Sequence, residues 1–266
     1  MISYEEVERS DNDDLLDVVT YFEKLGGYIP VMRDKLKLIS FDAWDTLLKL
    51  EMIANRISEG IGSLLDVKPE RVFDKMIETY MSLASSWLLG DLDDRRLLST
   101  AQKALASNLG TSAELVARGV ARGFSLIDPE EVLYPEVVEV VEKLSKNYIL
   151  AVVSNIFYWP GSYTRLLLEK AGIAGFFKVQ LYADEVGVSK PDRRIFAEAC
   201  KLCDVRPEEA AHVGDSLIED VGGALSAGMK AILLMRRSGR FRILKEVSLA
   251  IIPDLTKLEE AVKLLQ

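Results

Sequence analysis

The chain has 266 residues, of which 49% are hydrophobic and 28% are charged, and its formal net charge is -9. This length and composition suffice for one buried core with a smaller satellite domain. The acidic balance disfavours nucleic acid as a partner, and the lack of an apolar run of 18 residues predicts no membrane-spanning segment.

The N-terminal segment, residues 1–35, is predicted to form a helical extension. Asp13 or Asp14 can cap a helix there, and Gly26 and Gly27 would end it. The first residues are acidic and polar, so they resemble neither a signal peptide nor a transit peptide. We therefore expect a cytoplasmic protein.

A short apolar strand over residues 37–41 follows and ends at Asp42. From residue 50 to residue 131 the apolar residues recur three and four positions apart, with short breaks at 90–93 and 110–112. This pattern predicts an all-helical insert of about four helices, the size of a small bundle.

Beyond residue 132, helices and wholly apolar strands alternate. Strands that are apolar throughout and alternate with helices predict an α/β fold with a doubly wound parallel sheet. The core is therefore assigned to residues 36–49 and 132–266, and the helical insert to residues 50–131. The predicted strands are 148–153, 178–182, 210–213, 231–234 and 249–252, and the predicted helices are 135–144, 163–171, 192–203, 220–227 and 255–265.

Polar side chains stand just after the predicted strands, where ligands bind in open parallel sheets. These residues are Asp42, Ser154, Asn155, Asp215 and Asp220, with Lys190 in the loop after the third sheet strand. Clustered carboxylates repel one another unless a cation is present, and oxygen ligands select a hard ion such as Mg²⁺. A lysine and a hydroxyl–amide pair can bind phosphoryl oxygens. The set predicts phosphoryl transfer to a carboxylate.

Four motifs in order carry a family resemblance. They are Phe41-Asp42-x-x-x-Thr46-Leu47, Val153-Ser154-Asn155, Lys190-Pro191-Asp192, and Gly214-Asp215-Ser216 with Asp220. With these motifs the chain resembles the haloacid dehalogenase-like (HAD) hydrolases over residues 36–255. The helical insert lies where that family carries its C1 cap.

The resemblance implies a role for each of these residues. Asp42 would be the nucleophile and a Mg²⁺ ligand, with the backbone carbonyl of Trp44 and the carboxylate of Asp215 as further ligands. Ser154, Asn155 and Lys190 would bind the phosphoryl group of a small substrate. Asp220 would orient Lys190 or a metal-bound water.

One position departs from the family's phosphatases, which usually carry a second Asp two residues after the nucleophile. Here that position is Trp44, which has no proton to exchange at neutral pH. General acid–base catalysis contributes about 10²–10⁴ in rate. Asp45 is not expected to substitute, because adjacent residues in a turn point in different directions. Three aspartates of the insert are candidate acids, although a solvated helix-capping loop is favoured for them: Asp91, Asp93 and Asp94.

Two alternatives to a Mg²⁺ phosphatase follow. Dehalogenases of the same superfamily carry an aromatic residue at the position of Trp44 and need no metal, but Asp215 argues against them, and Arg56 is the only early candidate for binding a haloacid carboxylate. The other alternative is a catalytically weak relative that binds a phosphorylated ligand or a protein partner.

Several residues are expected to be structural. His212 is predicted to lie in the core, and Trp87 and Trp159 to be packed. Cys200 and Cys203 are expected as buried free thiols. The basic stretch is expected to be a solvated loop and helix start: Arg236, Arg237, Arg240, Arg242 and Lys245.

Overall fold

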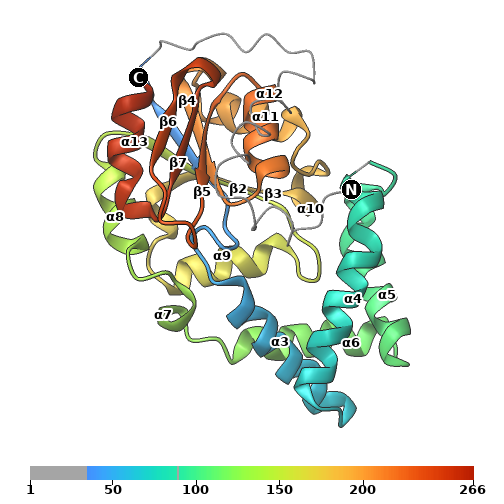
Figure 1. Ribbon diagram of the computed structural model, residues 1–266. Helices are drawn as coiled ribbons and strands as arrows, with labels where there is room; N and C mark the ends of the chain where they lie inside the picture. Colours follow the sequence, from blue (N-terminus) through green and yellow to red (C-terminus); the bar gives the residue numbers. More distant parts are fainter. Residues whose placement is uncertain (1–34, 89) are drawn as a thin grey trace.

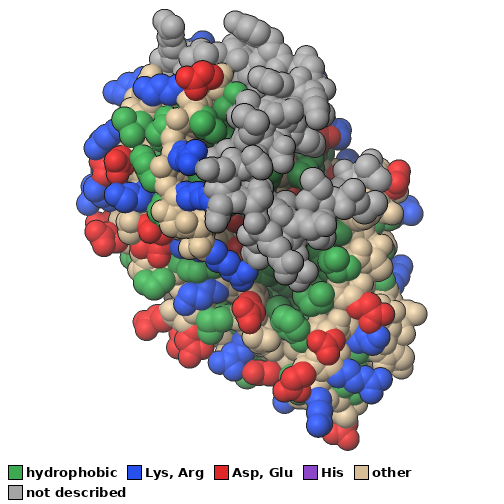
Figure 2. All heavy atoms as spheres, in the orientation of Figure 1, with side chains coloured by type: hydrophobic (Ala, Val, Ile, Leu, Met, Phe, Trp, Pro, Cys, Tyr) green, Lys and Arg blue, Asp and Glu red, His purple; other side chains and the backbone are tan. Residues whose placement is uncertain are grey.

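A computed structural model describes residues 35–88 and 90–266 of the chain. The helical extension predicted over residues 1–35 lies outside this range except for its last residue. Figure 2 shows acidic and basic side chains interspersed over the visible described part of one face. Mixed charge of this kind is ordinary for a surface in contact with water.

A seven-stranded sheet forms the centre of the molecule, in the order β3-β2-β1-β4-β5-β7-β6 (Figure 1). All neighbouring strands are parallel except β6 and β7. This arrangement confirms the predicted α/β class with a mainly parallel sheet. The strands are β1 (Leu38–Phe41), β2 (Ile149–Ser154), β3 (Phe177–Tyr182), β4 (Ala210–Gly214), β5 (Lys230–Leu234), β6 (Arg242–Leu244) and β7 (Leu249–Ile252).

Helices cover both faces of this sheet (Figure 1). Successive strand residues point to opposite faces, so Leu38 and Ile39 belong to different apolar clusters. The cluster of Ile39 includes residues of α8 (Val137–Ser145), α9 (Gly161–Lys170) and α13 (Leu258–Leu265), whereas the cluster of Leu38 includes residues of α11 (Arg193–Cys203) and α12 (Gly223–Ser226). Two-sided burial explains why these strands are apolar throughout.

The C-terminal part differs from prediction in two places. Residues 242–244 of the basic stretch form the antiparallel edge strand β6, so the predicted helix start is limited to the single turn Lys245–Val247. A short edge strand with an exposed arginine resists pairing with another chain. The helix predicted over 220–227 is instead a π-helical turn, Leu217–Gly222, followed by the four residues of α12.

Four long helices form a group at one end of the molecule (Figure 1). These four helices span residues 50–125 of the insert predicted over 50–131, and from here on we call residues 50–125 the helical insert. It agrees with the bundle predicted from helical spacing, with its turns near the predicted breaks. Its helices are α3 (Leu50–Leu65), α4 (Pro69–Leu88), α5 (Leu97–Leu109) and α6 (Ala113–Ser125), and the short α7 (Pro129–Val132) leads back to the core.

Two chain segments connect the insert with the core, and they pair with each other. The Lys49 amide donates to the Val132 carbonyl at 2.8 Å, and the Tyr134 amide donates to the Leu47 carbonyl at 3.2 Å. A single antiparallel bridge joins Leu48 to Leu133 between these bonds. The outgoing and returning segments are therefore hydrogen-bonded to each other and form one connection.

Two further predictions are tested by the described residues. Cys200 and Cys203 are buried free thiols, as expected. None of the helices in the described part of the chain combines the length and the apolar character needed to cross a membrane.

The insert depends on close contact between α3 and α6. A Cβ on Gly123 would lie 2.5 Å from the Arg56 carbonyl oxygen and 2.6 Å from the Ile57 Cα. Both are backbone atoms of α3, which a side-chain rotation cannot move aside. Glycine at this position therefore lets the two helices approach closely.

We expect Gly123→Ala to destabilise the insert by about 1–3 kcal/mol, because the methyl group forces the two backbones apart. Gly175→Ala is the matched control, since a Cβ there meets nothing within 4 Å. Thermal unfolding of both variants measures the difference. Equal melting temperatures would show that the α3–α6 contact tolerates the added methyl group.

Candidate active site

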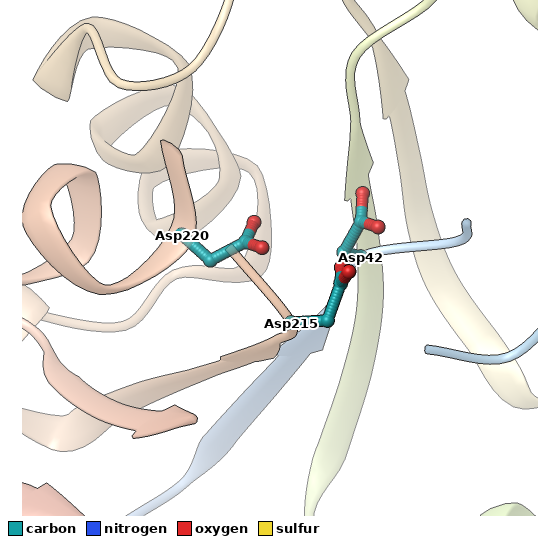
Figure 3. A group of neighbouring side chains, drawn as sticks. All are labelled: Asp42, Asp215 and Asp220. Carbon is teal, nitrogen blue, oxygen red and sulfur yellow. The ribbon is translucent and has the colours of Figure 1, made fainter. Parts of the chain in front are cut away.

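The predicted polar residues meet at the carboxyl edge of the sheet. Asp42 follows β1, Ser154 ends β2, and Asp215 follows β4. Since β1 lies between β2 and β4, these three positions are neighbours. Asp42, Asp215 and Asp220 each place one carboxylate oxygen in a group whose members lie within 4.8 Å of one another. Figure 3 shows the Asp220 carboxylate directed toward the other two from the turn that follows β4.

Lys190 holds this group together. Its Nζ donates to Oδ1 of Asp42 and to Oδ1 of Asp220, each at 2.6 Å. The lysine side chain is only 2% exposed. Burial opposes the charged ammonium, but the carboxylates of Asp220 and Asp42 outweigh it and raise the pKa of Lys190. The lysine therefore stays a cation in a buried position.

Asp220 is held by two further groups besides Lys190. Besides Lys190, its Oδ1 binds Nε2 of His212 at 3.0 Å, and its Oδ2 accepts the Ser216 amide at 2.9 Å. Although burial opposes ionisation, Lys190 and His212 hold the pKa of Asp220 below its usual range. A Cβ on Gly214 would lie 2.2 Å from the Asp220 Cγ, so the glycine of this motif makes room for the carboxyl group.

His212 lies in the core, as predicted, but it also reaches the site. Its ring is buried in β4, where Ser40 Oγ lies 2.8 Å from Nδ1. Burial lowers the pKa of His212, which favours the neutral ring. Sequence alone shows neither the strand register that pairs His212 with Ser40 nor the turn after β4 that brings Asp220 to the ring.

The surroundings of Asp42 and Asp215 disfavour the charged form of each carboxylate. Burial, together with Asp220, raises the pKa of Asp42 to about 6 against the effect of Lys190. Burial and the neighbouring aspartates also raise the pKa of Asp215. Carboxylates in this condition gain from a nearby cation, and an all-oxygen donor set fits a hard divalent ion such as Mg²⁺.

Asn155 holds the loop that carries Lys190. Its Oδ1 accepts the Lys190 amide at 2.8 Å, and its Nδ2 donates to the Lys190 carbonyl at 3.0 Å. The same Nδ2 binds Glu219, whose pKa burial raises to about 7. Glu219 was not singled out from the sequence, although it lies within the last motif. Ser154 is fully buried and its hydroxyl lies against Asp42.

Asp45 serves the backbone rather than the reaction centre. Its φ is 52°, in the left-handed region that favours glycine, and Asp tolerates it better than most residues. Its Oδ1 accepts the Leu50 amide at 3.1 Å and the Tyr134 hydroxyl at 3.4 Å. These contacts engage the Asp45 carboxylate within the loop, and the expectation that it takes no part in the reaction stays a prediction.

The indole of Trp44 packs edge-on against Trp159, with ring centroids 4.8 Å apart. Phe124 of the insert contacts Trp159 in turn, at 5.6 Å between centroids. Trp87 and Trp159 are both buried, as expected for packed residues. Trp44 therefore belongs to an aromatic contact between the core and the insert.

The insert also makes polar contacts with the core near Lys190. Asp94 Oδ2 accepts the Ser189 amide at 3.0 Å, and Asp94 Oδ1 accepts the indole N–H of Trp87 at 3.3 Å. The expected solvated capping role is right for Asp93, which caps the turn Asp94–Arg96 by accepting the Arg95 amide. For Asp94 it is wrong, because its carboxylate is engaged by the loop that carries Lys190.

Arg56, the early candidate for binding the carboxylate of a haloacid, is engaged by other residues. Its guanidinium binds Glu59 at 3.0 Å and Glu131 at 3.3 Å. Both partners lie on the surface of the insert and the segment that follows it. The guanidinium of Arg56 is therefore already paired with two carboxylates.

The comparisons with known proteins agree with the geometry. A family model of haloacid dehalogenase-like hydrolases matches residues 36–228. The HAD phosphatase of Thermococcus onnurineus superposes with a TM-score of 0.56 at 24% identity, covering 85% of this chain and 97% of that one. At this identity the superposition establishes the fold.

Two curated relatives have different activities. Glyceraldehyde 3-phosphate phosphatase of Methanothermobacter thermautotrophicus is 35% identical over 127 residues, covering 45% of this chain and 54% of that protein. The (S)-2-haloacid dehalogenase 4A of Burkholderia cepacia is 27% identical over 210 residues, covering 77% of this chain and 86% of that protein. The chain thus spans about half the length of the phosphatase.

We expect Asp94→Ala to loosen the insert from the core, because the Ser189 amide loses its acceptor. One lost hydrogen bond is worth about 1 kcal/mol, or about a fivefold rise in the open population. Hydrogen exchange of residues 187–192 and limited proteolysis measure the effect. Asp93→Ala is the control, because Asp93 caps a turn of the insert; if both variants behaved alike, the Asp94 contact would not hold the two parts together.

Proposed function

The chain belongs to the haloacid dehalogenase-like hydrolases, and on that premise we propose that it is a Mg²⁺-dependent phosphohydrolase of small phosphorylated molecules. The observation that carries the proposal is the meeting of Asp42, Asp215 and Asp220 within 4.8 Å, with the Lys190 ammonium bound to two of them. A hydrolase that works without metal has no use for the Asp215 carboxylate in this place. The 35% identity to a phosphatase supports the same activity.

In the proposed reaction a carboxylate oxygen of Asp42 attacks phosphorus, and the bond from phosphorus to the leaving-group oxygen breaks. The products are an acyl phosphate on Asp42 and the leaving group as its oxyanion, which takes a proton from water to become the alcohol or phenol. Water then attacks phosphorus, releases inorganic phosphate and restores the carboxylate. Mg²⁺, held by Asp42, the Trp44 carbonyl and Asp215, would neutralise the charge of the phosphoryl group.

The remaining side chains bind and orient. The Lys190 ammonium has three donors and uses two on Asp42 and Asp220, so one is left for a phosphoryl oxygen. Ser154, beside Asp42, offers a hydroxyl to the same group. Because the Asn155 amide is engaged by the main chain of Lys190, we assign it to placing that lysine.

The activity is tested with p-nitrophenyl phosphate in the presence of Mg²⁺ and after removal of the metal with EDTA. We expect turnover only with Mg²⁺. Loss of an outer partner of a metal site costs a factor of about 10–100. Asp215→Asn removes a direct ligand, so it should reduce the turnover by more than this factor. Asp42→Asn should abolish the turnover.

Asp254→Asn is the matched control, because this carboxylate caps the turn Leu255–Lys257 by accepting the Thr256 amide. Full Mg²⁺-dependent activity in Asp42→Asn would refute the nucleophile.

A dehalogenase is the second candidate, favoured by Trp44 and by the broad match to the Burkholderia cepacia enzyme. Its test is chloride release from 2-chloropropionate without metal. We expect none, because Arg56 is paired with Glu59 and Glu131. Release of chloride by the wild-type protein, with no hydrolysis of p-nitrophenyl phosphate, would replace the proposed phosphatase by the dehalogenase.

Because Trp44 stands where the proton donor usually lies, the rate of turnover should depend strongly on the leaving group. Without a proton donor at this position, we expect faster turnover of aryl phosphates than of alkyl phosphates. Trp44→Asp should raise the rate on an alkyl phosphate, up to the factor of about 10²–10⁴ that an acid–base residue supplies.

Trp44→Phe is the control, because it alters the packing on Trp159 without adding an acid. Steady-state rates on both substrates give the ratio. An unchanged ratio in folded Trp44→Asp protein would show that the leaving group is protonated by another residue.

A further inference from the structure

Arg236 belongs to the basic stretch, and its side chain reaches the loop that follows Asp42. It follows β5 by two positions, and the sequence predicted a solvated loop there. The structure corrects this, since the side chain is only 19% exposed. A half-buried guanidinium with directed contacts has a role other than solubility.

Two of its donors bind the loop that follows the nucleophile. Arg236 Nη2 donates to the Thr46 carbonyl at 2.8 Å, and Nε donates to the Asp45 carbonyl at 3.2 Å. These carbonyls come directly after Trp44, whose own carbonyl is assigned to the metal. The planar guanidinium thus fixes the orientation of two consecutive peptide groups.

The same guanidinium binds the segment that returns from the insert. It lies on the ring of Tyr134 at 3.4 Å from the centroid, and its Nη1 pairs with Glu136 at 2.6 Å. The Tyr134 hydroxyl, whose pKa burial raises to about 12, donates to Asp45 across the connection. Arg236 therefore contacts the outgoing and the returning segment at once.

The loop needs such support. Asp45 holds a left-handed φ of 52°, which a non-glycine residue adopts at a cost unless its surroundings fix it. Its amide, side chain and carbonyl are all bonded, to Leu48, to Leu50 and Tyr134, and to Arg236 respectively.

We propose that Arg236 is a positioning residue, which locks both connections of the insert to the end of β5 and thereby fixes the loop that presents the Trp44 carbonyl. The effect on the metal rests on the proposed function, whereas the effect on the loop does not. Arg236→Met removes every donor but keeps much of the length. Arg236→Lys keeps one cation and loses the planar fork.

Arg165→Met is the matched control. Arg165 makes the same kind of contacts at another place, because it lies over the Tyr182 ring at 5.0 Å and pairs with Glu185 at 2.7 Å. It donates to the Gln180 carbonyl of β3 and not to the loop after Asp42. Its loss costs a comparable set of contacts without releasing that loop.

The first measurement is hydrogen exchange of residues 43–50, which requires no activity. We expect faster exchange in Arg236→Met, a smaller change in Arg236→Lys and wild-type behaviour in Arg165→Met. Equal exchange in wild type and folded Arg236→Met would overturn the proposal. If Arg236→Met fails to fold, Arg236→Lys decides in the same way.

The second measurement is Mg²⁺ binding by calorimetry, with the Mg²⁺ dependence of p-nitrophenyl phosphate turnover beside it. We expect Arg236→Met to weaken Mg²⁺ binding by about 10–100-fold, with Arg236→Lys between it and the wild type. Unchanged binding would overturn the link to the metal. A wild type that bound no Mg²⁺ and lacked turnover would refute the proposed function, while the exchange result would still decide the locking role.

Discussion

A buried ammonium between two buried carboxylates is the interaction on which the site depends. Lys190 lies between Asp42 and Asp220, and the charged pairs replace the water that each group loses on burial. Removing the ammonium would leave two buried carboxylates without a compensating charge. Much of the surrounding structure fixes these three residues: Asn155 holds the backbone of Lys190, His212 and Ser216 hold Asp220, and Gly214 leaves the space.

The fold and most of the site could be predicted from sequence, because they depend on local pattern. Strands that are apolar throughout predicted the parallel sheet, the residues directly after two of them pointed to Asp42 and Asp215, and the loop after the third sheet strand pointed to Lys190. The edge strand at Arg242–Leu244 was missed because three residues within a basic stretch resemble a loop. Its pairing with β7 depends on a partner that no local pattern names.

The residues that the sequence did not assign share another property, in that their roles arise from long-range neighbours. His212 meets Ser40 of a neighbouring strand, Asp94 reaches from the insert to Ser189 of the core, and Arg236 reaches Thr46 over 190 positions of chain. Each looks like a common core, capping or surface residue in its own segment. Motifs report the groups that take part in chemistry, whereas the groups that hold them in place become visible only when the chain is folded.

The close contact of α3 and α6 has a consequence for how this protein can change over evolutionary time. Since Gly123 lets two backbones touch, the outgoing helix and its partner form a stiff unit, and the paired connection at Leu48 and Leu133 joins that unit to the core. Substitutions on the outer surfaces of α4 and α5 can then accumulate without disturbing the loop after Asp42. Selection for a new substrate can then change the helical insert, while the residues of the site in the core stay the same.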